Sequence, residues 1–352
     1  GYSRGLLEAA HCSVLAIDRD PGAARYAESL ESYFPGRLKF VVGRYAEMRE
    51  IAEREGIAAV DGVALDLGVS SMQLDEAERG FSFSQDGPLD MRMGAEGLTA
   101  SDLVNEMPER DLAAIIATLG EEKRARAIVR AIAARRAEEP ITRTGELADI
   151  VARVLGRKHD DPKHPATRTF QALRLYLNQE LLELARGLSA AEHLLAPNGR
   201  LAVVTFHSLE DRIAKRFFAA RSMPAPKGSR HLPEKGGSNF LPSFRLLNRR
   251  PLSPSKDEIR LNPRARSARL RAGERTDAPP HALDLPRVVR QQSHGPQVER
   301  RQHCGRVVVR ASVDGHGQHV VPAQRVAFGA ALRGADDVAC RPGVAVAVLL
   351  QP

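Results

Sequence analysis

Two short runs in the chain combine residue types that can bind a nucleoside and assist a reaction at an amine. The first is residues 66–73 (DLGVSSMQ), which follow a strongly apolar segment. A carboxylate, hydroxyls and an amide supply hydrogen-bond acceptors and donors for an adenine ring and for a reacting amino group. The same residue types also form ordinary turns, so the spacing alone leaves both interpretations open.

The second run is residues 206–212 (FHSLEDR), which follow the apolar segment 200–206. It gathers His207 and Asp211 with other ionisable side chains at the start of an expected helix, where Ser208 and Asp211 resemble a capping box. A single histidine at a strand end is more often structural than catalytic. Because several ionisable groups are gathered here, a catalytic role and a structural role for His207 both stay open.

Asp18 ends a third apolar segment, residues 13–17. A carboxylate in that place can accept hydrogen bonds from a ribose diol. It could also cap the next helix, but Asp20, followed by Pro21, is better placed for capping. Gly1 and Tyr2 precede a helical stretch. A glycine before a helix can be the last residue of a glycine-rich turn that binds a ligand, but one glycine does not establish such a turn.

The elements that must position these residues alternate between strand and helix. Apolar segments at 13–17, 38–42 and 60–66 are separated by helical stretches, which predicts parallel strands in an α/β sheet. Residues 98–187 carry apolar residues at steps of three and four, which predicts a helical insertion. A strand at 200–206 and a pair of strands at 244–252 and 265–272 then resume the sheet. Ligands bind at the carboxyl ends of the strands in such a sheet.

We therefore predict an α/β fold with an inserted all-helical domain. The sheet domain would cover residues 1–95 and 188–276, and the helical domain residues 96–187. Residues 277–352 contain no Lys, Ile or Met, and their valines show no clear period. We find no amphipathic face there that would dock on the rest, and expect a segment that is disordered or foreign to the fold.

The positive charge of the chain is concentrated in one stretch. The formal net charge is +8, and residues 227–276 hold 13 Lys and Arg against 4 Asp and Glu. A localised basic stretch is typical of proteins that bind nucleic acid, although a solvated surface has the same composition. Five arginines on an expected helix of the insertion could extend this surface: Arg124, Arg126, Arg130, Arg135 and Arg136.

Other classes of protein are disfavoured by composition. No apolar run reaches the ~20 residues that span a bilayer, and no signal peptide opens the chain. Cys12, Cys304 and Cys340 are too scattered for a disulfide framework or a zinc site, so we expect no bound metal. These observations predict a cytoplasmic protein that does not associate with membranes.

Seven runs of residues together resemble the 16S rRNA (cytosine-N4)-methyltransferase H family. They are residues 16–21 (AIDRDP), 65–71 (LDLGVSS), 79–83 (RGFSF), 86–93 (DGPLDMRM), 164–172 (HPATRTFQA), 206–212 (FHSLEDR) and 262–267 (NPRARS). The runs are long and in order, and they cover the chain from its start to about residue 276. The resemblance implies a Rossmann-like, S-adenosylmethionine-dependent methyltransferase fold with a helical insertion. It also implies transfer of a methyl group to the exocyclic N4 of a cytidine in 16S rRNA, with the small ribosomal subunit as partner.

The resemblance further implies which residues contact S-adenosylmethionine. Asp18 would hold the ribose, Tyr45 would lie near the methionine and adenine moieties, and Asp66 and Gln73 would line the adenosyl site. Gly1 and Tyr2 complete this set.

The reaction itself calls for a proton acceptor. The lone pair of cytosine N4 is delocalised into the ring, so the nitrogen is a poor nucleophile. An acceptor for an amino proton would help to localise that pair. We hypothesise that Asp66, Ser70 or the cluster of His207 and Asp211 provides the acceptor.

The chain departs from this family at both ends. Family members have further residues before the position of Gly1, including the first strand, which is central in the sheet. With the first strand missing, the strands at 13–17 and 60–66 would lose the neighbour between them, leaving two rows of backbone groups unpaired. The sequence therefore predicts weak cofactor binding and a poorly stable sheet. The segment from residue 277 onward also lies outside the family pattern.

Two other functions compete with methyl transfer. A nicotinamide-dependent oxidoreductase would share the sheet and Asp18, but should show a fuller glycine motif and gives no reason for the runs at 66–73 and 207–211. A truncated remnant could bind RNA without catalysis. The sequence leaves open the oligomeric state, and whether the substrate is free RNA or an assembled subunit.

Overall fold

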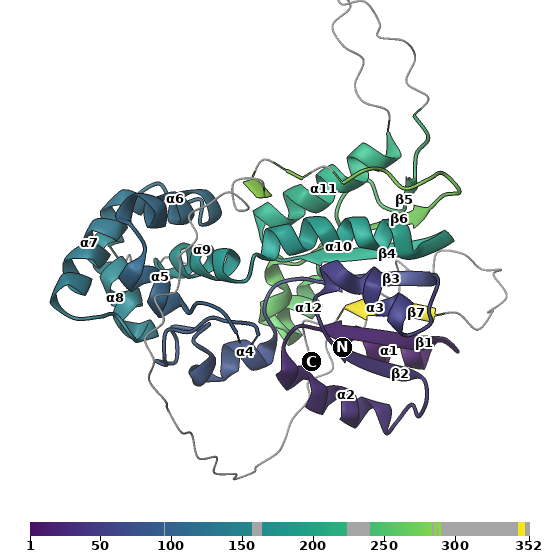
Figure 1. The fold of residues 1–352 in the computed structure, drawn as a ribbon, viewed down its shortest axis with the longest axis horizontal. Helices are drawn as coiled ribbons and strands as arrows, with labels where there is room; N and C mark the ends of the chain where they lie inside the picture. Colours follow the sequence, from purple (N-terminus) through teal and green to yellow (C-terminus); the bar gives the residue numbers. More distant parts are fainter. Residues whose placement is uncertain are drawn as a thin grey trace, which may run out of the picture.

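The computed structural model describes residues 1–94, 96–156, 164–223, 240–283, 285–286, 288–289 and 344–348. Figure 1 shows two parts, a sheet covered by helices and a group of helices to one side of it. Residues 227–239 of the basic stretch and most of the segment 277–352, with Cys304 and Cys340, lie outside the described residues.

Within the described ranges the sheet has seven strands in the order β2-β1-β7-β3-β4-β6-β5. Neighbours from β2 to β4 are parallel, whereas β6 is antiparallel to both β4 and β5. The strands are β1 (Ser13–Asp18), β2 (Leu38–Val42), β3 (Val60–Asp66), β4 (Leu195–Thr205), β5 (Phe244–Leu246), β6 (Arg269–Arg275) and β7 (Val344–Val348). The predicted strands at 13–17, 38–42, 60–66 and 200–206 are confirmed. The closing pair is also confirmed, with β5 shorter than expected and β6 shifted toward the C-terminus.

Both faces of the sheet are covered by helices. Leu15 and Ile17 of β1 pack in the larger core with α3 (Met48–Arg54), α10 (Glu180–Leu194) and α11 (Ser208–Ser222). Val14 and Ala16 point the other way and pack with residues of α1 (Tyr2–Ala9) and α2 (Ala24–Glu31). Burial on both faces explains why these strands are continuous apolar runs rather than alternating ones.

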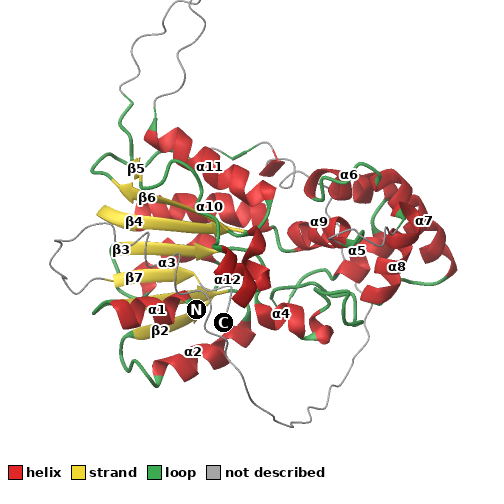
Figure 2. Ribbon diagram, turned by 180° about the vertical axis from the view of Figure 1, so that it is seen from behind, coloured by secondary structure: helices red, strands yellow, loops and turns green. Residues whose placement is uncertain are grey.

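Several short helical elements lie among the strands and the longer helices along the chain. They are η1 (Pro21–Ala23), η2 (Tyr45–Glu47), α4 (Ser71–Asp75), η3 (Ala77–Arg79), α12 (Lys256–Leu261) and η4 (Pro263–Ser267). Seen from behind, α4 and α12 lie between the sheet and the helical part (Figure 2).

The helical part contains α5 (Ala100–Glu106), α6 (Glu109–Leu119), α7 (Ala125–Glu138), α8 (Thr144–Leu155) and α9 (Thr167–Leu177). The apolar positions of α6 and α8 that the sequence spacing selects, such as Ile116 and Val151, are fully buried. The predicted periodicity of the insertion is confirmed. We call residues 100–177 the insert.

The insert ends earlier than the expected boundary at residue 187. Helix α10 packs against η2, α3 and α11, and therefore belongs to the layer that covers the sheet. Leu181, Leu184 and Leu188 of α10 continue the apolar spacing of the preceding helix, so the periodicity shows no break. At Asn178 the chain passes from helices that pack within the insert to a helix that packs on the sheet. The spacing of apolar residues in the sequence does not change there.

The expectation of two unpaired strand edges is wrong. Strand β7 lies between β1 and β3 and pairs in parallel with both, Val348 lying opposite Ile17 on one side and Leu65 on the other. The run VAVAV at 344–348 is short, apolar and β-branched at every second residue, as in a buried parallel strand. A strand position in a sheet can be filled from any part of the chain, and here residues 344–348 fill the position between β1 and β3.

The expectation that nothing after residue 276 docks on the body is also wrong for the described part. Val289 is fully buried, and Leu285 and Val288 pack against the larger core. The backbone N–H of His281 donates to Glu192 Oε1 at 3.1 Å. These few contacts are separated by polar residues and prolines, so no helical or strand period reveals them.

Candidate active site

The two acids at the strand ends lie at the same level of the sheet. Val348 of β7 pairs with Ile17 of β1 on one side and with Leu65 of β3 on the other. Asp18 and Asp66 are the next residues along those two strands. Two strand spacings place their backbones about 10 Å apart. On the far side of β3, Asp66 pairs with Val204 of β4, three residues before His207. The predicted position of Asp18, Asp66 and His207 at one edge of the sheet is confirmed. Their opening onto a shared cleft stays a prediction, because none of the three is among the residues that line the pocket at this edge.

A pocket opens beyond this edge. Its lining comes from the turns after β1 and β3, from η2, from the start of α10 and from α11. The lining residues are Arg19, Tyr45, Leu67, Gly68, Met93, Glu180, Glu183, Leu184 and Glu210. Two glycines shape it. Gly68 has φ +102°, a conformation that side chains rarely adopt, and a Cβ at Gly187 would lie 2.4 Å from the Tyr45 ring.

Asp18 is buried and already holds one hydrogen bond. Its Oδ1 accepts from the backbone N–H of Asp20 at 2.8 Å. Burial raises the pKa of Asp18 to about 7. The carboxyl group is therefore held in one orientation. A ligand that donates hydrogen bonds to it would stabilise its ionised form.

Asp66 is the most unusual polar group of the site. Its side chain is 1% exposed, and neither Oδ1 nor Oδ2 has a hydrogen-bond partner among the described residues. Burial, followed by the negative charge of Glu210, raises the pKa of Asp66 to about 8. An unpartnered buried carboxyl group is costly and calls for a ligand that donates hydrogen bonds. This feature fits a nucleoside cofactor or an amino substrate.

The two tyrosines of the expected cofactor set are both at this edge. Tyr45 is buried and lines the pocket. Tyr2 packs against a cluster that includes Val204 of β4 and Leu270 of β6. Burial raises the pKa of Tyr2, and the charge of Asp66 adds to the effect. Gly1 is the N-cap residue of α1.

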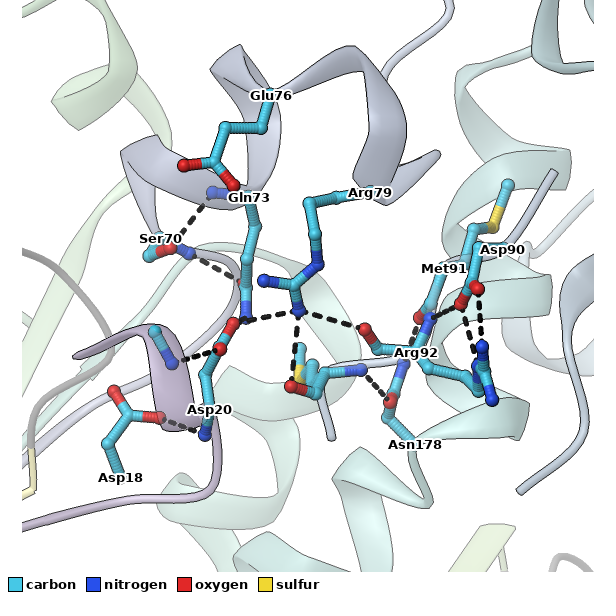
Figure 3. Close-up of polar contacts among 12 residues, drawn as sticks. Asp18, Asp20, Ser70, Gln73, Glu76, Arg79, Asp90, Met91, Arg92 and Asn178 are labelled. Atoms are coloured by element: carbon cyan, nitrogen blue, oxygen red, sulfur yellow. Dashed lines mark hydrogen bonds and ion pairs between the residues drawn. The ribbon is translucent and has the colours of Figure 1, made fainter. Parts of the chain in front are cut away.

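Ser70 and Gln73 form a capping box at the start of α4. Ser70 Oγ accepts from the backbone N–H of Gln73 at 3.1 Å, and Gln73 Oε1 accepts from the backbone N–H of Ser70 at 3.0 Å. Gln73 Nε2 also donates to Asp20 Oδ2 at 2.8 Å (Figure 3). Both side chains are buried and hold the helix that follows Asp66.

His207 and Glu210 form a second capping box, at the start of α11. His207 Nδ1 accepts from the backbone N–H of Glu210 at 3.4 Å, and Glu210 Oε2 accepts from the backbone N–H of His207 at 3.3 Å. Glu210 Oε2 also accepts from the backbone N–H of Phe206 at 2.8 Å. His207 Nε2 lies 3.1 Å from Glu210 Oε1, an ion-pair distance, but outside hydrogen-bond geometry. Burial alone would raise the pKa of Glu210, but His207 and the backbone donor outweigh it, so the pKa is lowered.

Asp211 is engaged elsewhere. Its carboxylate accepts two hydrogen bonds from Arg271, at 2.8 and 3.0 Å, and one from Arg269 at 3.3 Å. Burial would raise the pKa of Asp211, but these arginines lower it. The residue ties α11 to β6 and is not part of the pocket lining. Glu210, one position earlier, faces the pocket instead.

Sequence reasoning missed the acids of α10. Glu180 accepts two hydrogen bonds from Arg174, and Glu183 accepts from Arg44 Nε at 2.7 Å and from the backbone N–H of Ala46 at 3.0 Å. Both glutamates are buried and line the pocket. The sequence could have indicated them, because Glu180 and Glu183 are three residues apart within a run of leucines. This spacing places both carboxylates on one face of a helix that is otherwise apolar.

The expected basic surface is only partly free. Arg126 and Arg130 of α7 are exposed, whereas Arg135 pairs with Glu139 and Glu146, and Arg136 donates to backbone carbonyls. In the basic stretch, several arginines pair with acids: Arg245, Arg260, Arg264, Arg269 and Arg271. In the parts of the chain that the structure describes, no helix is long and apolar enough to cross a membrane.

Comparison with known proteins gives a consistent result. The model of a family described as the MraW methylase family matches residues 1–276. A protein of Parvibaculum lavamentivorans is 58% identical over 285 residues, covering 81% of this chain and 84% of its own. A protein of a Methylobacterium species is 58% identical over 281 residues, covering 79% and 83%. One of Rhodospirillum rubrum is 55% identical over 282 residues, covering 79% and 86%. All three are named ribosomal RNA small subunit methyltransferase H.

Proposed function

The chain belongs to the MraW methylase family, and from this premise we propose that it methylates the exocyclic N4 of a cytidine in 16S rRNA of the small ribosomal subunit, with S-adenosylmethionine as donor. The unpartnered, buried carboxyl group of Asp66 is the observation that supports this chemistry most directly. Family membership favours methyl transfer over hydride transfer to a nicotinamide. We also propose that the protein acts in the cytoplasm, because its proposed substrate is ribosomal.

The cofactor would be held by residues around the strand ends. Asp18 would accept hydrogen bonds from the ribose hydroxyls, because its carboxyl group is fixed by the backbone N–H of Asp20. Tyr45 would pack along the cofactor from η2, while Gln73 and Asp66 would line the adenosyl site. Gly1 and Tyr2 would border it from the start of α1. When bound, S-adenosylmethionine supplies a methyl group on a positively charged sulfur, which is already a strong electrophile.

Asp66 is also our proposed proton acceptor. Its carboxylate would accept a hydrogen bond from the N4 amino group and then take the proton that this nitrogen loses as its new bond to carbon forms. Only the ionised form can act in this way. Because the pKa of Asp66 is about 8 without ligand, most of the carboxyl groups are neutral at pH 7 and must ionise first.

The other candidates for the acceptor have competing engagements. The Ser70 hydroxyl caps α4, and the Asp211 carboxylate is paired with two arginines. His207 Nε2 faces Glu210 at ion-pair distance but outside hydrogen-bond geometry, so this pair would orient the base rather than relay the proton. We therefore propose that Asp66 takes the proton and that His207 and Glu210 border the cytosine. Ser70 and Asp211 would have structural roles, Ser70 at the start of α4 and Asp211 between α11 and β6.

Orientation supplies much of the remaining rate enhancement. A target base must leave its stack to enter a buried pocket. Holding the amino nitrogen in line with the methyl group can contribute ~7 kcal/mol or more to lowering the barrier. The exposed arginines of α7 and the basic stretch after residue 240 are the surfaces that would bind the surrounding RNA phosphates.

Product identification tests this proposal. Purified protein would be incubated with isotopically methyl-labelled S-adenosylmethionine and small subunits or 16S rRNA that lack the modification. The RNA would then be digested to nucleosides, which are separated by chromatography and identified by mass spectrometry. We expect labelled N4-methylcytidine, and strong loss of product in Asp18→Ala. Label in another nucleoside, or in none, would contradict the proposal.

A further inference from the structure

Two runs that mark the family have no role in the chemistry above, residues 79–83 and 86–93. In the structure they meet around one side chain, Arg79 (Figure 3). The guanidinium of Arg79 lies 2.8 Å from Oδ2 of Asp20 and donates to the carbonyls of Arg92, at 3.1 Å, and Met93, at 3.2 Å. A single planar cation therefore joins the turn after β1 to the loop that leads into the insert.

On one side, Asp20 connects two proposed cofactor contacts. It is 2% exposed, its Oδ2 accepts from Gln73, and its backbone N–H donates to Asp18. Its Oδ1 accepts from the backbone N–H of Gly22 at 2.9 Å. The position of Asp20 therefore determines where the Asp18 carboxyl group and the Gln73 amide lie.

On the other side, the loop at 91–93 is held at the junction between insert and sheet. Asn178, the residue between α9 and α10, accepts from the backbone N–H of Met93 and donates to the carbonyl of Met91, both at 2.9 Å. Arg19 donates to the carbonyl of Asn178 at 2.7 Å. Met93 and Arg19 also line the pocket.

The chemistry of arginine suits this junction. All three contacts are made by one nitrogen, Nη2, which shares its two hydrogens among the Asp20 carboxylate and the two carbonyl oxygens. The planar guanidinium holds this nitrogen in a fixed direction. A lysine would keep the charge but lose the fixed geometry. Because Asp20 is buried, the loss of its cation would leave a buried carboxylate that only Gln73 and the backbone satisfy.

We propose that Arg79 is a positioning residue for S-adenosylmethionine. It acts through Asp20 on Asp18 and Gln73, and it fixes these residues relative to the insert. The inference rests on the proposed function, because it assumes that Asp18 and Gln73 contact that cofactor. It assigns Arg79 no contact with the reacting atoms.

Calorimetric titration with S-adenosylmethionine tests the proposal without relying on turnover. We expect the Kd of Arg79→Gln to rise about tenfold, as for the loss of one charge-assisted interaction, and that of Arg79→Lys to rise less. KM for the cofactor should rise by the same factor while kcat at saturation stays within about twofold. Arg25→Gln is the matched control, because Arg25 pairs with the neighbouring Glu76 at 2.7 Å on the exposed surface. Its Kd should equal that of the parent protein.

A double-mutant cycle separates positioning from general damage. Asp20→Asn should weaken cofactor binding, and Arg79→Gln combined with Asp20→Asn should weaken it no further than the stronger single change. The proposal would be overturned by an unchanged Kd in folded Arg79→Gln. It would also be overturned if the factors by which the two single changes raise the Kd multiplied in the double variant. If Arg79→Gln does not fold, Arg79→Lys and Asp20→Asn decide it, because parent-like affinity in both would also overturn it. Absence of binding by the parent protein would overturn the proposed function itself, together with this inference.

Discussion

Glu210 and Asp66 are two buried carboxyl groups at one sheet edge whose pKa values are displaced in opposite directions. The pKa of Glu210 is lowered, because His207 and a backbone donor outweigh its burial. The pKa of Asp66 is raised to about 8 by burial and then by the charge of Glu210. One acid therefore stays ionised at neutral pH, while the other is poised to gain or lose a proton there.

The first prediction concerns pH. If Asp66 must be ionised to accept the proton, kcat/KM rises with pH, reaches half of its plateau at a pH near the pKa of about 8, and levels off above it. At pH 7 it should be roughly tenfold below the plateau. Glu210→Gln removes the neighbouring negative charge, so the midpoint of its profile should move to lower pH. A profile that is flat from pH 6 to 9, or a midpoint unmoved in Glu210→Gln, would contradict this coupling.

The second prediction separates Asp211 from catalysis. Asp211→Asn removes a charge that Arg271 and Arg269 hold between α11 and β6. The free energy of unfolding should fall by about 2 kcal/mol, because a half-buried arginine pair loses its partner. Cofactor-saturated kcat should stay within about twofold of the parent value. A large loss of kcat without loss of stability would restore Asp211 as a catalytic candidate.

The sequence predicted the positions of Asp18 and Asp66 well, because an acid directly after a buried parallel strand can lie only at the carboxyl edge of the sheet. It selected Asp211, whereas Glu210 is the residue that faces the pocket. Neighbouring helix positions point about 100° apart, and the capping box of His207 decides which of them faces the pocket. The position of β7 could not be predicted either, because its partners are hundreds of residues away and no local pattern encodes them.

The third prediction concerns this strand. Ala345→Pro or Ala347→Pro removes a backbone donor from a strand that is paired on both sides. We expect a loss of roughly 2–4 kcal/mol in the free energy of unfolding. Ala282→Pro, at an exposed position without regular structure, is the control and should change stability little. Equal melting temperatures for all these variants would show that residues 344–348 do not complete the sheet in solution.

The fourth prediction concerns RNA. Arg126 and Arg130 are exposed on α7 and lie one helical turn apart. Reversing both charges, Arg126→Glu with Arg130→Glu, should weaken rRNA binding and reduce the slope of log affinity against log salt by about 2. The control is Arg49→Glu on α3, whose side chain pairs with Glu53 on the surface. Equal salt slopes for the parent protein and the double variant would exclude this face from the RNA interface.

The role of Asp66 is tested by the single-turnover rate of methyl transfer in Asp66→Asn, measured with saturating cofactor and rRNA from pH 6 to 9. The amide keeps the size of the side chain but cannot take a proton. We expect a rate at least ~100-fold below that of the parent protein at its plateau, with no rise as the pH increases. A rate in Asp66→Asn equal to the parent plateau would show that the proton goes elsewhere.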